Sequence, residues 1–69
     1  MSKFEIEKNY QVVNGGIITI KKRTDKTVLV NGFYSGRVKV IKFNDCEELT
    51  FKSDFPGIKY FCFSENEVV

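Results

Sequence analysis

The sequence predicts an all-β protein, folded as a small antiparallel barrel of five to six strands that is SH3-like or OB-like. Apolar and polar residues alternate with period two, and turn-forming residues recur roughly every eight to twelve positions. No segment repeats apolar residues at helical spacing over several turns. The 69 residues, 42% of them hydrophobic, suit one domain over residues 1–69 with a single core. A barrel is favoured because closure removes exposed sheet edges.

The first expected strand is short and precedes a glycine turn. Tyr10–Val13 is this strand, and Glu5–Lys8 is a candidate lead-in strand before it. Asn14–Gly16 makes the turn because Asn and Gly tolerate positive φ. The full set of expected strands is Tyr10–Val13, Ile17–Arg23, Thr27–Asn31, Arg37–Phe43, Glu47–Lys52 and Ile58–Phe63.

The second and third strands form the best-defined hairpin. In Ile17–Arg23 the isoleucines at 18 and 20 are expected to face the core, which places Lys21 and Arg23 on the outside. Thr24–Lys26 is a tight polar turn, and Thr27–Asn31 returns with its valines at 28 and 30 on the inner side. We therefore expect these two strands to pair with each other.

The fourth strand, Arg37–Phe43, follows a loop that carries Phe33 and Tyr34. Arg37 and Lys39 are expected to face outward, with the valines at 38 and 40 inward. The alternation then slips because residues 41 and 43 are apolar. A bulge near residues 40 and 41 would restore the pattern and bend the strand, as barrels require.

The last two strands complete the expected barrel. Glu47–Lys52 alternates cleanly, with its leucine and phenylalanine inward, and Ser53–Gly57 forms a Pro-Gly turn. Ile58–Phe63 is apolar on both faces, so it is expected either inside the fold or in an interface. The tail over residues 64–69 is expected to be frayed.

Composition argues against an enzyme and against a cofactor or metal site. The chain has no histidine, which removes the commonest general base and a common metal ligand. Cys46 lies among acidic residues that oppose thiolate formation, and both Cys46 and Cys62 are expected to be free, buried thiols. Asp45, Glu47 and Glu48 match no calcium-loop spacing, and an acidic, solvated strand start is the simpler interpretation.

The chain is also expected to be cytoplasmic. No secretory signal is visible at the N-terminus, and no apolar run approaches the length that spans a membrane, so no membrane partner is expected. Two cysteines are fewer than disulfide-rich secreted domains carry, which favours a reducing compartment.

Positive charge is concentrated in one part of the chain. Residues 21–42 hold seven basic residues and one acid, a net +6, whereas the remainder holds four bases and eight acids, a net −4. These parts give the overall +2. Bases beside exposed rings are typical of surfaces that bind nucleic acid, because cations follow phosphates while rings stack on bases. The candidate contacts are Lys21, Arg23, Phe33, Tyr34, Arg37 and Lys39, for single-stranded or duplex nucleic acid.

Two other interpretations stay open. Outward lysines and arginines also occur on any solvated sheet, and Phe33 would then only cap the barrel. Alternatively, the protein binds an acidic protein partner or a second copy of itself, as an inhibitor or accessory factor acting on a host protein. The candidate interface residues for that interpretation are Tyr60, Phe61 and Phe63, in the strand that is apolar on both faces.

A stretch of the chain resembles a known group of proteins. Ile20–Val28, with its Lys-Arg-Thr-x-Lys-Thr-Val core, and the basic strand Gly36–Val40 resemble short, uncharacterised β-rich proteins of bacterial phages and other mobile elements. The resemblance covers mainly residues 20–42, and the loop over residues 31–35 departs from it. It implies a cytoplasmic location in a bacterial host and a small accessory role, for which binding nucleic acid or inhibiting a host protein would both be suitable.

Overall fold

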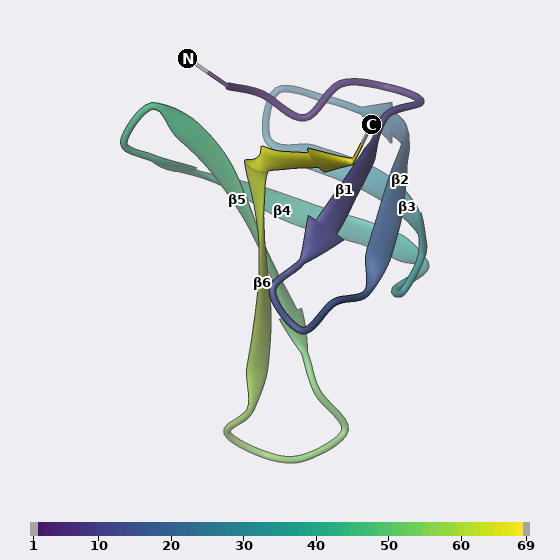
Figure 1. The fold of residues 1–69 in the computed structure, drawn as a ribbon, viewed down its shortest axis with the longest axis vertical. Helices are drawn as coiled ribbons and strands as arrows, with labels where there is room; N and C mark the ends of the chain where they lie inside the picture. Colours follow the sequence, from purple (N-terminus) through teal and green to yellow (C-terminus); the bar gives the residue numbers. More distant parts are fainter. Residues whose placement is uncertain (1, 69) are drawn as a thin grey trace.

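The computed structural model describes residues 2–68, which form a closed antiparallel barrel (Figure 1). Each strand pairs with its neighbours in sequence, and β1 pairs with β6 to close the sheet. The strands are β1 (Asn9–Val12), β2 (Ile17–Arg23), β3 (Thr27–Gly32), β4 (Gly36–Phe43), β5 (Cys46–Lys52) and β6 (Lys59–Val68). The predicted all-β fold and small barrel are confirmed, and the choice between an SH3-like and an OB-like barrel stays a prediction.

Alternate residues of every strand fill the barrel. The expected hairpin of β2 and β3 is present, with Ile20 opposite Val30 and both side chains buried. The buried apolar core consists of Phe4, Tyr10, Val12, Ile18, Ile20, Val28, Val30, Val38, Val40, Leu49, Phe51 and Cys62. Period-two alternation therefore assigned most of the core correctly.

A β-bulge in β2 changes which side chains face outward. Ile20 lies opposite Val30 and Lys22 lies opposite Leu29, so Lys21 is an extra residue in β2. Lys21 and Lys22 are both exposed, and the phase of the strand is reversed after them. The expectation that Arg23 faces outward beside Lys21 was wrong, because the bulge turns Arg23 toward the barrel end.

The bulge expected near residues 40 and 41 does not occur. The β4–β5 pairing runs in regular register from Val40–Leu49 to Phe43–Cys46. Ile41 and Phe43 consequently stay on the outer face, where they are 46% and 50% exposed. A regular strand keeps alternating, so two apolar residues at outward positions remain in contact with solvent.

Two expectations about the chain ends also change. Residues 5–8 form a turn instead of a lead-in strand. The tail expected to fray is part of β6 as far as Val68, and residue 69 lies outside the described residues. Between the pairs Val12–Cys62 and Tyr10–Glu67, β1 has one residue and β6 has four. This large irregularity lets β6 change direction and pair with β1 (Figure 1).

An aromatic side chain closes each end of the barrel. At one end Phe4 is buried edge-on against Tyr10, with ring centroids 4.8 Å apart. At the other end Phe33 packs edge-on against Phe51 and Tyr60, at 6.0 and 5.6 Å between centroids. A Cβ atom on Gly16 would overlap the Phe33 ring, so the glycine makes room for this cap. Phe33 therefore has the capping role that was one of the two expectations for it.

Candidate nucleic-acid interface

Basic side chains from three strands gather on one outer surface of the barrel. Lys22 on β2 and Arg37 on β4 both lie opposite Leu29 of β3, so they belong to one cross-strand row. Neighbouring strands are about 4.8 Å apart, which puts the two backbones roughly 10 Å from each other. Lys39 continues the outer side of β4, opposite Thr27. We define the basic face as Lys21, Lys22, Arg37, Lys39 and Lys52.

A shallow groove of 330 Å³ runs between β4 and β5 on this face. Tyr34 lies at the groove, and Arg37 and Lys39 contribute from β4. Thr50 and Lys52 contribute from β5, and the Phe51 ring lies beside Tyr34. The groove thus combines three cations, the Thr50 hydroxyl and the rings of Tyr34 and Phe51 in one place.

Within the part of the chain that the structure describes, the cations of the basic face form no ion pair with an acidic side chain. Among residues 2–68, ion pairs are formed by Lys8, with Glu5 and Glu67, and by Arg23, with Glu47. Arg37 instead donates a hydrogen bond from Nη1 to the Thr27 hydroxyl, at 3.3 Å. A surface with several unneutralised cations attracts anions.

Tyr34 and Phe33 differ in how far they are available to a ligand. Both rings are 39% exposed. Phe33 packs against Phe51, Tyr60 and Gly16 at the end of the barrel. The Tyr34 ring is tilted 46° against Phe51, with centroids 5.3 Å apart, and also contacts the Gly36 position. Gly36 has a φ of 143°, so this close approach occurs at a residue suited to glycine.

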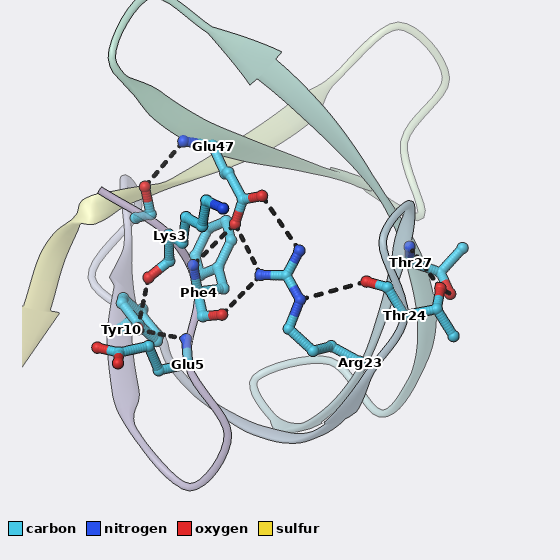
Figure 2. A network of polar contacts seen from close by, with 9 residues as sticks. Lys3, Phe4, Glu5, Tyr10, Arg23, Thr24, Thr27 and Glu47 are labelled. Atoms are coloured by element: carbon cyan, nitrogen blue, oxygen red, sulfur yellow. Dashed lines mark hydrogen bonds and ion pairs between the residues drawn. The ribbon is translucent and has the colours of Figure 1, made fainter. Parts of the chain in front are cut away.

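Arg23 is not part of the basic face, because it forms an internal ion pair (Figure 2). Its Nη1 and Nη2 donate to Oε1 and Oε2 of Glu47 at 2.8 and 3.1 Å. Nη1 also donates to the carbonyl of Phe4 at 2.6 Å. The hydrogen bond with Glu47 raises the pKa of Arg23 further. This geometry directs the guanidinium into the fold and away from an external phosphate.

The Glu47 carboxylate is held in its charged form. Its burial acts to raise its pKa, but hydrogen bonds from Arg23 and from the Phe4 amide outweigh burial, so the pKa lies below the usual value. The Phe4 amide donates to Oε1 at 2.8 Å, and the Glu47 amide donates to the Ser64 hydroxyl at 2.8 Å. Both oxygens of the Glu47 carboxylate are therefore engaged within the fold, by Arg23 and by the Phe4 amide.

A second basic hollow adjoins the basic face. It also has a volume of 330 Å³ and is lined by Lys26, Lys39 and Lys42, with Asp25 and Val40. The Val40 amide donates to the Lys26 carbonyl at 2.8 Å, which holds the β2–β3 turn against β4. Lys39 thus takes part in both hollows and connects them into one positive surface.

The three candidate interface residues do not share one surface. Tyr60 points inward, partly buried against the core. Phe61 and Phe63 lie on the outer face of β6, opposite Thr50 and Glu48. Phe63 contacts the Phe43 ring, with centroids 6.4 Å apart. An interface on β6 would therefore use Phe61 and Phe63 without Tyr60.

Both cysteine thiols are enclosed by the fold. Cys46 and Cys62 are free and buried. Burial raises the pKa of Cys62 to about 12, and burial followed by the nearby Glu65 and Glu48 charges raises the pKa of Cys46. Within residues 2–68, no three Cys, Asp or Glu side chains converge closely enough to hold a metal ion. The same part of the chain includes no helix long and apolar enough to cross a membrane.

Sequence reasoning missed two members of the basic face, Lys22 and Lys52. Strict alternation through β2 selects Lys21 and Arg23 as the outward residues and so leaves Lys22 out of the predicted contacts. Lys52 is at the end of β5, outside the charge-rich segment, and it joins the groove only because β5 lies beside β4. The three consecutive basic residues at 21–23 indicate that at least one of them faces outward. The sequence pattern does not identify which, because the bulge sets the orientation.

Comparisons of the chain with protein-family models, with curated proteins and with solved structures gave no match. The resemblance of residues 20–42 to proteins of phages and mobile elements therefore stays a prediction.

Proposed function

We propose that the protein is a non-enzymatic module that binds single-stranded nucleic acid through its basic face. The observation that carries the proposal is the groove in which Tyr34 lies beside Arg37, Lys39 and Lys52. These cations have no acidic partner among the described residues, so they are available to phosphates. A ring next to free cations provides both parts of single-strand recognition, stacking and charge.

A single strand suits this surface better than a duplex. The groove is shallow, and no helix among residues 2–68 could enter a duplex groove. A base can reach the Tyr34 ring only when it is unpaired and turned out of a stack. The proposed roles are phosphate contact for Lys21, Lys22, Arg37, Lys39 and Lys52, and base stacking for Tyr34.

Salt dependence of binding tests the electrostatic part. With five phosphate contacts, the logarithm of the affinity for a single strand falls with the logarithm of salt at a slope of about −3.5. Fluorescence anisotropy of a labelled oligonucleotide, from about 50 to about 200 mM salt, would then show roughly a hundredfold loss of affinity. An affinity that does not change with salt would contradict the proposal.

Single substitutions locate the binding surface. Lys39→Ala is expected to reduce the magnitude of the salt slope by about 0.7, and Arg37→Ala/Lys39→Ala by about 1.4. Lys3→Ala removes the same charge at the opposite end of the barrel, where Lys3 lies on the segment that holds Phe4 (Figure 2). It should leave the slope unchanged. Equal effects of Lys3→Ala and Lys39→Ala would show binding that is not confined to the basic face.

Substitution of Tyr34 tests stacking. Tyr34→Ala is expected to weaken single-strand binding by about 1–3 kcal/mol, whereas Tyr34→Phe keeps the ring and most of the affinity. Duplex of the same length should bind more weakly than the single strand and should respond little to Tyr34→Ala. Equal binding of both forms, with no effect of Tyr34→Ala, would contradict base stacking.

A further inference from the structure

An apolar patch lies on the outer surface of β4 and β6, beside the end of β1. We define the apolar patch as Val13, Ile41, Phe43, Phe61 and Phe63. Ile41 and Phe63 both lie opposite Glu48 of β5, one on each side. The Val13 amide donates to the Phe61 carbonyl at 2.8 Å, which brings β1 to the edge of the patch. Glu48 lies between Ile41 and Phe63, and the rings of Phe43 and Phe63 meet across β5 with centroids 6.4 Å apart, which joins the two sides of the patch.

The core does not account for this patch. Its members stand on the outer side of their strands, whereas the buried core comes from the inner side. Phe43 and Ile41 are about half exposed, at 50% and 46%, and Phe61 is 38% exposed. Scattered apolar residues on a surface need no explanation, but a contiguous group with aromatic members is typical of an interface.

Charge is ordered along the same surface. At one end of the β5–β6 pair, Lys52 lies directly opposite Lys59, and both are exposed. Two like charges in one cross-strand pair repel each other. At the other end are two exposed acids: Glu65, two residues beyond Phe63 on β6, and Asp45, in the turn directly before β5. The surface thus runs from basic, through apolar, to acidic.

We infer that the apolar patch is the contact face of a two-fold homodimer. A two-fold axis that lies in the contact plane at the middle of the patch, perpendicular to the basic-to-acidic direction, places the acidic end of one copy over the Lys52–Lys59 end of the other. The rings of the two patches then bury each other. Such an isologous contact needs a self-complementary surface, and the basic-apolar-acidic order provides one. A partner of uniform charge would match only one of the two ends, which favours a second copy of this chain.

Oligomeric state as a function of concentration tests the apolar contact. Sedimentation equilibrium of the full chain is expected to show a reversible monomer–dimer transition. Phe43→Thr/Phe61→Thr should raise the dimer dissociation constant by at least about tenfold, as loss of interface rings usually does. Phe55→Thr removes an equally apolar ring that is 68% exposed in the β5–β6 turn, outside the patch, and should change nothing. Circular dichroism would confirm that each variant is folded.

Charge exchange tests the two-fold arrangement. Lys59→Glu and Glu65→Lys should each weaken the dimer by roughly fivefold or more, since each change acts twice in a symmetric dimer. The double variant Lys59→Glu/Glu65→Lys should recover the wild-type dissociation constant, because the ends again carry opposite charges.

Two results would overturn the inference. One concerns the apolar contact: the wild-type protein stays monomeric up to millimolar concentration, or its dimer dissociation constant is not changed by Phe43→Thr/Phe61→Thr. The other concerns the charges: Lys59→Glu/Glu65→Lys dimerises no more tightly than either single variant. That result would exclude the contact between the acidic end of one copy and the Lys52–Lys59 end of the other. Phe43→Thr/Phe61→Thr leaves every residue of the basic face in place and removes the dimer contact that would cover Lys52, so nucleic-acid binding by this variant is expected to persist.

Discussion

At the scale of single residues, Glu47 is an acid that keeps its charge inside the barrel. Its side chain is 2% exposed, and its carboxylate accepts hydrogen bonds from both terminal nitrogens of Arg23. The Arg23 side chain is 19% exposed. Burying an ion is costly unless its hydrogen bonds are complete. The Phe4 amide supplies a further bond, so the pair also holds the N-terminal segment (Figure 2).

Acid stability is expected to depend on Glu47. Because its native pKa lies below the unfolded value of about 4.3, the charged carboxylate stabilises the fold above that value. This stability is lost as the pH falls through the lowered native pKa. Glu47→Gln should lower the free energy of unfolding by roughly 3 kcal/mol at neutral pH, the lower end for a broken buried pair. The difference in the free energy of unfolding between Glu47→Gln and wild type should become smaller below about pH 4.

Urea unfolding at several pH values measures this effect. Glu7→Gln is the matched control, since Glu7 is exposed and makes no ion pair among the described residues. It should follow the wild-type curve at every pH. A difference between Glu47→Gln and wild type that stays constant into acid would show that the carboxylate charge is not what stabilises the fold.

At the scale of elements, the N-terminal segment works as a plug held by hydrogen bonds. Phe4 is buried, and the segment around it is fixed by Tyr10, whose hydroxyl accepts from the Glu5 amide at 2.8 Å. The Glu7 amide donates to the Ile20 carbonyl at 2.6 Å. A segment without regular strand structure is therefore an integral part of the barrel.

Removal of the plug should be strongly destabilising. Phe4→Ala is expected to cost about 3–5 kcal/mol, because it removes a buried ring and leaves a cavity. That is a large part of the stability of a domain of this size. Ile6→Ala, in the same segment but at a residue that is 53% exposed, should change stability by less than about 0.5 kcal/mol. Thermal or urea unfolding measures both variants. An equal loss of stability in Phe4→Ala and Ile6→Ala would mean that the Phe4 ring is not buried in the barrel end.

The bulge in β2 is the element that decides the composition of the basic face. It puts Lys21 and Lys22 together on the outer side and sends Arg23 to Glu47. Without this extra residue, strict alternation would direct Lys22 toward the barrel interior and Arg23 outward. The bulge thus separates one cation that pairs inside the fold from two that are exposed on the outer side.

At the scale of the whole molecule, closure of the barrel buries Cys62 between β1 and β5. It lies opposite Val12 on one side and Leu49 on the other, and it has no exposed surface. A thiol with a pKa of about 12 is almost entirely protonated at neutral pH. Its reaction with a thiol reagent should therefore require opening of the barrel.

Thiol labelling of a Cys46→Ser variant measures that opening. We expect labelling of Cys62 to be slow in native buffer and to accelerate with urea in parallel with global unfolding. The labelling rate in unfolded protein provides the control for intrinsic reactivity. Rapid labelling without urea would show that β6 separates from its neighbours much more easily than the closed barrel implies.

The sequence by itself determined the fold class, most strand bounds, the inward apolar positions and the charge excess of residues 21–42. These follow from local patterns, because alternation and turn residues act over a few neighbouring positions. It also identified Tyr34, Arg37 and Lys39, which the structure places in one groove.

Only the tertiary structure decided the phase of β2 after its bulge, the pairing of Arg23 with Glu47 and the burial of Phe4. It also decided that Lys52 joins the groove and that the 64–68 segment closes the barrel. Each depends on contacts between residues far apart in the chain, such as the 24 positions from Arg23 to Glu47. A one-residue change of register reverses every side chain beyond it, and register is set by the pairing partner.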